Sequence, residues 1–200
     1  MIHALPGMGS DQRLYPGEWK RLPKFTAHDW MPYRGEQTLT EVARSMCDSC
    51  SIRDGDVLVG TSLGGMVACE ITKIRKIPEL YLVASAVTKN EVNSLIAALR
   101  PFLRVAPVEL LKLSAASVPL ERAQMFLNVE ASFIRSMCGA IFEWDGLGVT
   151  STRVSRIHGK RDYMITPPKH VDLLLEGGHL LTMTHANECV EFIMAHLQRE

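Results

Sequence analysis

The chain has 200 residues, of which 46% are hydrophobic, and its 22 basic and 22 acidic side chains leave it without net charge at pH 7. This size and composition predict one globular domain over residues 1–200 with a substantial hydrophobic core. The balanced charge argues against a nucleic-acid-binding surface, and no stretch is long and apolar enough to span a bilayer.

A short apolar strand is predicted at Met1–Leu5, and a glycine-rich turn follows it at Pro6–Asp11. The turn lacks the Gly-Lys-Ser/Thr and Gly-x-Gly-x-x-Gly patterns of phosphate-binding loops. A glycine-rich loop at the end of a strand can instead direct a backbone N–H toward the edge of the sheet. We expect this second use here.

Strands and helices alternate over the next part of the chain. The expected elements are a strand over Phe25–Trp30, a helix from Thr38 to about Cys50, a strand at Val57–Val59, a helix to about Lys76 and a strand over Glu79–Ser85. Thr38 and Glu41 have the spacing of a capping box at the start of the first helix. This alternation is typical of a mostly parallel sheet.

No strand-like run occurs from Ala86 to about Gly148. Helical segments are expected there instead, separated by prolines: Glu91–Leu99, Val108–Ala115, Leu120–Leu127 and Ala131–Phe142. Because the insert is too long for one crossover, we interpret residues 86–148 as a helical lid rather than as ordinary helices flanking the sheet. Its Leu, Ile, Phe and Met content predicts an apolar underside that would accept an apolar substrate group.

Strand and helix patterns return after the insert. We expect a strand over Thr152–Gly159, a short helix opened by Pro167–Pro168, the end of that helix and a last strand within Val171–Glu176, and a final helix from about Asn187 to Leu197. The alternation therefore resumes at the carboxyl end of the chain.

The most informative stretch is Gly60-Thr61-Ser62-Leu63-Gly64-Gly65, which lies between a predicted strand and a predicted helix. A nucleophilic serine needs a sharp, strained turn of this kind so that its hydroxyl stands above the sheet. The residues two before and two after Ser62 are crowded in such a turn, and Gly60 and Gly64 have no Cβ to clash. The following helix directs N–H groups at the serine, and the Leu63 N–H can stabilise an oxyanion.

A serine hydroxyl becomes an effective nucleophile when a histidine removes its proton and a carboxylate orients that histidine. Asp162 and His179 are the candidates, because each follows a predicted strand and such loops converge at one edge of a parallel sheet. Two glycines precede His179 and allow a sharp, exposed turn. The rival bases are His3, His28, His158, His170, His185 and His196, and the rival acids are Asp145 and Asp172.

With these three motifs in this order, the chain resembles the α/β-hydrolase family over almost its whole length. Ser62 matches that family's nucleophile elbow, Asp162 its strand-Gly-x-x-Asp loop and His179 its Gly-His loop. The resemblance implies an α/β-hydrolase fold with a mostly parallel sheet of about six strands that lacks the usual N-terminal strands. It also places the family's cap at the helical insert over 86–148.

The resemblance further implies that a backbone N–H in the glycine-rich loop is the second donor of an oxyanion hole, beside Leu63. Aligning Pro6-Gly7 with the family's His-Gly makes this donor the Met8 N–H, whereas aligning His3-Ala4 makes it the Leu5 N–H. We favour Met8, because the glycines on both sides of it let the backbone bend beside the serine.

These residues predict a serine hydrolase of the carboxylesterase type, which cleaves an ester-like acyl compound through an acyl-enzyme and needs no metal or organic cofactor. The same residues would serve a thioesterase, a lactonase or an acyltransferase, and the fold is also used by small-molecule receptors. The expected partner is a small-molecule acyl substrate, and the chain is expected to be a monomer or a homodimer.

The first residues, Met1–Gly7, lack the basic region and long apolar core of a signal peptide. The five scattered cysteines, an odd number, suit reduced thiols, so we expect a cytoplasmic protein. Cys47 and Cys50 have the Cys-x-x-Cys spacing. They lie near the end of a helix without a second pair, so no metal or redox role is expected for them.

Overall fold

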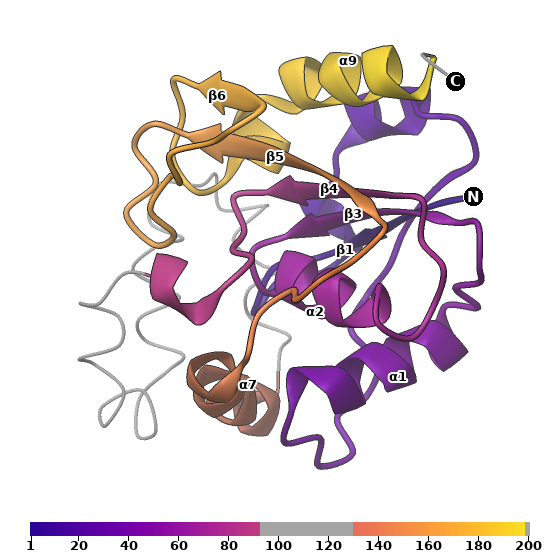
Figure 1. The fold of residues 1–200 in the computed structure, drawn as a ribbon, viewed down its shortest axis with the longest axis vertical. Coiled ribbons are helices and arrows are strands. Elements are labelled where there is room, and N and C mark those ends of the chain that lie inside the picture. Colours follow the sequence, from indigo (N-terminus) through magenta and orange to yellow (C-terminus); the bar gives the residue numbers. More distant parts are fainter. Residues whose placement is uncertain (93–129, 199–200) are drawn as a thin grey trace.

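The computed structural model describes residues 1–92 and 130–198. The six strands within these residues form one parallel sheet (Figure 1). The strands are β1 (Ile2–Leu5), β2 (Phe25–Ala27), β3 (Val57–Thr61), β4 (Glu79–Val83), β5 (Arg153–Gly159) and β6 (Leu173–Leu175). Their order is β2-β1-β3-β4-β5-β6, and every neighbouring pair is parallel. The prediction of a mostly parallel sheet of about six strands is confirmed.

Helices cover both faces of this sheet, as Figure 1 shows. One face carries α1 (Leu39–Ser49), α2 (Leu63–Ile71) and α7 (Ala131–Glu143), and the other carries the 3₁₀ helix η2 (Gly17–Arg21) and α9 (Ala186–Leu197). Three shorter elements complete the described part: η1 (Gln12–Leu14), η3 (Lys89–Glu91) and α8 (Leu181–Thr184). The sheet is therefore the middle of three layers.

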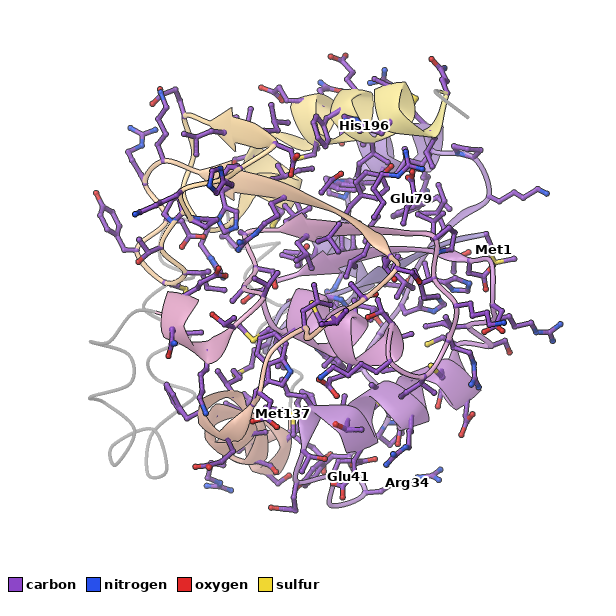
Figure 2. The ribbon with its side chains drawn as sticks, in the orientation of Figure 1. Met1, Arg34, Glu41, Glu79, Met137 and His196 are labelled. Atoms are coloured by element: carbon purple, nitrogen blue, oxygen red, sulfur yellow. The ribbon has the colours of Figure 1, made fainter. Side chains whose placement is uncertain are left out.

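The central strands β3 and β4 are largely apolar on both faces because both faces are covered. In β3, Leu58 packs into the core beneath α1 and α2, whereas the next residue, Val59, packs into the core beneath α9. Successive side chains of a strand point to opposite faces. In β4, accordingly, Leu80 packs into the core beneath α1 and α2, and Tyr81 packs into the core beneath α9. Met137 of α7, labelled in Figure 2, is fully buried in the first of these cores.

The start of α1 is the capping box that the sequence predicts. The Thr38 hydroxyl accepts a hydrogen bond from the Glu41 backbone N–H, and the Glu41 carboxylate accepts one from the Thr38 backbone N–H. The helix ends where Ser51 takes a φ of 53°, a left-handed conformation that an α-helix does not continue through. The helix predicted from Thr38 to about Cys50 is thus confirmed.

The second strand is shorter than expected, because side chains beyond it make hydrogen bonds outside the sheet. β2 ends at Ala27 rather than near Trp30. The Asp29 carboxylate accepts from the Gln12 backbone and side chain, and the Trp30 indole N–H donates to the Gly7 carbonyl oxygen. These bonds turn the chain away from β1 toward the glycine-rich loop.

The prediction of a helix that opens at Pro167–Pro168 is wrong, because this segment pairs with a distant part of the chain and is extended. Ile165 forms an antiparallel bridge with Val92, and the Thr166 N–H donates to the Glu91 carbonyl oxygen. Residues 166–172 then run to β6 without helix. Tertiary pairing has overridden the local helix-start signal.

Two 3₁₀ helices between β1 and β2, η1 and η2, have no counterpart among the predicted elements. They bury Leu14 and Trp19, and the Trp19 indole N–H donates to the Thr182 carbonyl oxygen at 2.9 Å. The short helix α8 follows the His179 turn and was not predicted either. In such short elements the hydrophobic period is too brief to be recognised.

The predicted helix over Ala131–Phe142 is confirmed as α7, which runs one residue further. Residues 93–129, the larger part of the expected lid over 86–148, lie outside the described residues, and so do the helices predicted at 108–115 and 120–127. Within the described residues, every helix is too short or too polar to cross a membrane.

Candidate active site

Ser62 lies in the turn between β3 and α2, with φ 52° and ψ −120°. A positive φ is strained for a residue with a Cβ and costs about 1–3 kcal/mol, so the surroundings must enforce it. The Ser62 N–H donates to the Val83 carbonyl oxygen of β4 at 3.2 Å. A Cβ on Gly60 would lie 2.4 Å from the Gly65 Cα, so the turn closes only with glycine at position 60.

Gly64 of α2 packs tightly against the chain at the start of the glycine-rich loop, so its substitution is expected to destabilise the fold strongly. A Cβ there would lie 2.4 Å from both the Leu5 and the Pro6 carbonyl oxygens. Because both atoms are backbone, we expect Gly64→Ala to lower the free energy of unfolding by more than about 4 kcal/mol, measured by urea denaturation.

The matched control for this prediction is Gly139→Ala in the middle of α7, where nothing lies within 4 Å of the added methyl group. Alanine is favoured over glycine in a helix, so this variant is expected to be more stable by up to about 1 kcal/mol. Equal stability of Gly64→Ala and the wild type would contradict the observed packing of the turn.

Ser62, His179 and Asp162 are joined by two hydrogen bonds. His179 Nε2 lies 3.0 Å from Ser62 Oγ, and His179 Nδ1 lies 2.8 Å from Asp162 Oδ2. A carboxylate can only accept, so Nδ1 carries the imidazole proton and Nε2 is left to accept the serine O–H. The Asp162 side chain is fully buried, whereas 16% of the His179 side chain is exposed.

The Asp162 carboxylate is fixed by backbone donors as well as by the histidine. Its Oδ1 accepts from the Met164 N–H at 2.9 Å and from the Ile165 N–H at 3.0 Å. A buried carboxylate needs such donors to compensate for its lost hydration. The same bonds fix the side chain so that Oδ2 faces His179.

The loops that hold Asp162 and His179 pack backbone against backbone. The Arg161 N–H donates to the Gly177 carbonyl oxygen at 2.9 Å, and a Cβ on Gly159 would lie 2.4 Å from that same oxygen. This close approach sets the spacing between the acid and the imidazole. The carboxyl ends of β3, β5 and β6 thus contribute one residue each to the hydrogen-bonded chain.

The N–H groups predicted to stabilise an oxyanion belong to Leu63, which directly follows Ser62, and to Met8, whose neighbour Gly7 lies against Ser62. Leu63 is the first residue of α2, and Met8 follows Gly7, where an added Cβ would lie 3.6 Å from the Ser62 Cβ. The Met8 N–H has no hydrogen-bond partner among the described residues. Leu5, the alternative donor, lies within β1 opposite Gly60 and is fully buried in the core.

The rival histidines and acids are engaged elsewhere or lie at the surface. His3 lies between His28 and Asp56, at 2.8 and 3.2 Å, and the His158 Nε2–H donates to the Ser85 carbonyl oxygen at 3.0 Å. Further partners hold Asp172, His185 and His196, while Asp145 and His170 are exposed. Among the residues that the structure describes, only His179 has a hydrogen bond to the Ser62 hydroxyl.

Buried neutral histidines make stability depend on pH. Burial, reinforced by nearby Arg156, lowers the pKa of His158 to about 4, and burial beside His3 lowers that of His28 to about 4. The unfolded chain, with histidine pKa values near 6.5, binds these protons first. We therefore expect stability that is complete above pH 6.5 and is lost as the pH falls toward 4, by at most about 1.4 kcal/mol per pH unit for each histidine.

This dependence can be measured as the urea-unfolding free energy between pH 7.5 and 4.5. His158→Gln keeps a side-chain N–H donor without the titrating ring, so the slope of the free energy against pH is expected to decrease. His170→Gln, at an exposed position, is the control and is expected to keep the wild-type slope. Equal slopes in all three proteins would contradict the assignment to His158.

Ser85 forms a hydrogen bond with the turn at Ser62. The sequence motifs did not indicate this residue. Its hydroxyl donates to the Ser62 carbonyl oxygen at 2.7 Å, and its own carbonyl oxygen accepts from His158 and Arg156. Arg156 is in turn paired with Glu91, at 2.7 Å between Nη2 and Oε2. A small polar residue just beyond the strand next to the nucleophile strand is the signal that could have found it.

The described residues contain no group of three or more His, Cys, Asp or Glu side chains positioned to hold a metal ion. All five cysteines are free thiols. Cys50 lies at the end of α1, as predicted, and burial raises the pKa of its thiol to about 11. A thiol with so high a pKa is a poor nucleophile and a poor metal ligand.

No protein-family model and no curated protein sequence matches the chain. Several solved structures match the chain. A hydrolase from Oleispira antarctica, olei00960, is 15% identical with a TM-score of 0.80, over 100% of this chain and 91% of that one. The enol-lactonase from Burkholderia xenovorans LB400 is 14% identical with a TM-score of 0.78, over 98% and 90%. A thermophilic esterase from Thermogutta terrifontis is 16% identical with a TM-score of 0.73, over 99% and 89%.

These similarities cover 98–100% of this chain and 89–91% of the other chains. Together with the strand order and the turn at Ser62, they establish that the chain has the α/β-hydrolase fold, as the sequence motifs predict. At identities near 15% the likeness concerns the fold, and the chemistry has to be argued from the residues of this chain.

Proposed function

We propose that this α/β-hydrolase-fold chain is a serine hydrolase that cleaves ester-like acyl compounds. The observation that carries the proposal is the hydrogen-bonded chain of Ser62, His179 and Asp162, with its 3.0 and 2.8 Å distances, at a serine in a strained turn. This arrangement has the geometry of nucleophile, base and orienting acid. Solved structures of similar fold include an esterase and an enol-lactonase, which supports the same class of reaction.

In the proposed mechanism, Ser62 Oγ attacks the substrate carbonyl carbon while His179 Nε2 takes its proton. Asp162 keeps the imidazole in the Nδ1–H form and stabilises its positive charge. The carbonyl oxygen becomes an oxyanion, to which the Leu63 and Met8 N–H groups donate hydrogen bonds. His179 then gives the proton to the leaving alcohol oxygen, and an acyl-enzyme on Ser62 remains.

Water completes the cycle. His179 removes a proton from a water molecule, whose oxygen attacks the acyl carbon, and a second oxyanion forms in the same place. When the bond to Ser62 Oγ breaks, His179 returns the proton to the serine and the free acid leaves. This cycle requires no metal or organic cofactor.

A direct test is turnover of a panel of p-nitrophenyl esters, aliphatic thioesters and lactones, with products identified by mass spectrometry. The proposal expects the free acid as the main product of at least one ester. A folded protein that binds members of the panel tightly and turns none over would favour a receptor role instead.

Acyl transfer uses the same residues, so it is the second candidate function. The acyl-enzyme would pass its acyl group to an alcohol, amine or thiol if the bound acceptor excludes water. Turnover in the presence of competing nucleophiles distinguishes the two: hydrolysis gives mainly free acid, whereas a transferase gives mainly the new ester, amide or thioester.

We further propose a small-molecule acyl substrate as the ligand, and no role in nucleic-acid binding, because the acidic and basic side chains balance. The five free thiols support a reducing compartment such as the cytoplasm. Monomer and homodimer are distinguished by light scattering at the concentrations used for the assays.

A further inference from the structure

The Gly7 carbonyl oxygen receives hydrogen bonds from three donors. The Trp30 indole N–H donates to it at 3.0 Å, the Ser10 hydroxyl at 2.9 Å and the Ser10 backbone N–H at 3.2 Å. The last bond closes a turn over residues 7–10, in which Gly9 has a φ of 75°, as the third residue of a type II turn requires. Three donors on one carbonyl fix the orientation of its peptide group.

That peptide group also contains the Met8 N–H. In a trans peptide the C=O and N–H bonds point in opposite directions, and all peptide bonds of the described residues are trans. With the Gly7 oxygen held inside the turn, the Met8 N–H must point out of it. It has no partner among the described residues, and Gly7 lies against Ser62. The three donors therefore present a free N–H next to the nucleophile.

Trp30 packs against α7. Its ring lies 5.2 Å from the ring of Phe133, and the Met8 sulfur lies 3.8 Å from the Cys138 sulfur of the same helix. Phe133 is buried in the core that α7 shares with α1 and α2. The loop that contains Met8 is thus fixed by α7 through two separate contacts, one to Trp30 and one to Met8.

We propose that Trp30, assisted by Ser10, is a positioning residue of the reaction, which acts by orienting the Gly7–Met8 peptide so that the Met8 N–H faces the oxyanion. The inference rests on the proposed hydrolase function. It assigns a catalytic consequence to a side chain whose hydrogen bond among the described residues goes to Gly7 and not to Ser62, His179 or Asp162. Such preorganisation matters because a donor that must first rotate into place stabilises the transition state less.

The test is Trp30→Phe, which retains an aromatic ring against Phe133 and removes the N–H. On a p-nitrophenyl ester that the wild type hydrolyses, we expect kcat to fall about tenfold with KM changed less than about twofold. Loss of a complete oxyanion donor costs about 10²–10³ in kcat, so the double variant Trp30→Phe/Ser10→Ala is expected to lose about 100-fold. Affinity for a trifluoromethyl ketone, which forms an oxyanion on Ser62, is expected to fall by the same factors.

Trp144→Phe is the matched control. It removes another indole N–H bond, to the carboxylate of Glu70 at 2.8 Å, near the carboxyl end of α2, whereas the glycine-rich loop packs on Gly64 at the start of that helix. We expect it to lose stability with kcat and ketone affinity unchanged. This separates general loosening of the fold from a specific effect on the oxyanion.

The possible outcomes are distinct. A wild type that turns over esters and a Trp30→Phe protein with the same kcat and ketone affinity would overturn this inference and leave the proposed function standing. A wild type without ester turnover and without reaction with the ketone would overturn both. A fall in kcat and ketone affinity in Trp30→Phe, absent from Trp144→Phe, would establish the positioning role.

Discussion

A Ser62→Ala protein is expected to lose ester turnover by a factor of about 10⁵–10⁶ in kcat while keeping its fold. The factor follows from removal of the group that is proposed to form the acyl-enzyme, as in serine proteases that lose their nucleophile. Stability is expected to change by less than about 1 kcal/mol, because Ala retains the Cβ and the same backbone strain. The measurements are kcat on the best ester of the panel and the urea midpoint.

The control for this variant is Ser51→Ala. Ser51 is also a serine with a left-handed backbone, φ 53° against 52° at Ser62, but it is exposed at the end of α1. We expect it to keep full activity and a similar urea midpoint. Retained turnover in a correctly folded Ser62→Ala protein would reject the nucleophile assignment.

Asp162→Asn is expected to lower kcat by about 10⁴ with little change in the positions of the side chains. The amide can accept the Met164 and Ile165 N–H bonds through its oxygen and present its NH₂ to His179 Nδ1. That contact favours the tautomer with the proton on Nε2, which cannot accept the serine proton. The expected loss is in kcat at neutral and alkaline pH.

Asp172→Asn provides the comparison for that loss. Asp172 also accepts a backbone N–H, from Arg156 at 2.7 Å, but it has no contact with His179 among the described residues. Its activity is expected to match the wild type. Equal effects of the two substitutions would contradict the role given to Asp162.

The elements that position the site could be predicted because their signals are local. The apolar run before Ser62, the glycines on both sides of it and the capping box at Thr38 each act within a few residues. The order of the serine, acid and histidine motifs added the long-range information. The three side chains were therefore predicted together, and the structure places them within hydrogen-bonding distance.

The features that escaped prediction depend on contacts between distant parts of the chain. The indole of Trp30 bonds Gly7 across 23 residues, and the Ser85 hydroxyl bonds Ser62 across the same separation. The failed helix at Pro167–Pro168 was overridden by pairing of Ile165 with Val92. Propensity and periodicity contain no information about such partners, because both are summed over short windows.

The central claim is that Ser62 is an activated nucleophile, and the most direct measurement is intact mass after exposure to a fluorophosphonate. We expect one adduct on the wild type and none on Ser62→Ala or His179→Ala, since the first lacks the nucleophile and the second its base. An unmodified, folded wild-type protein, or an adduct that persists in Ser62→Ala, would contradict the claim.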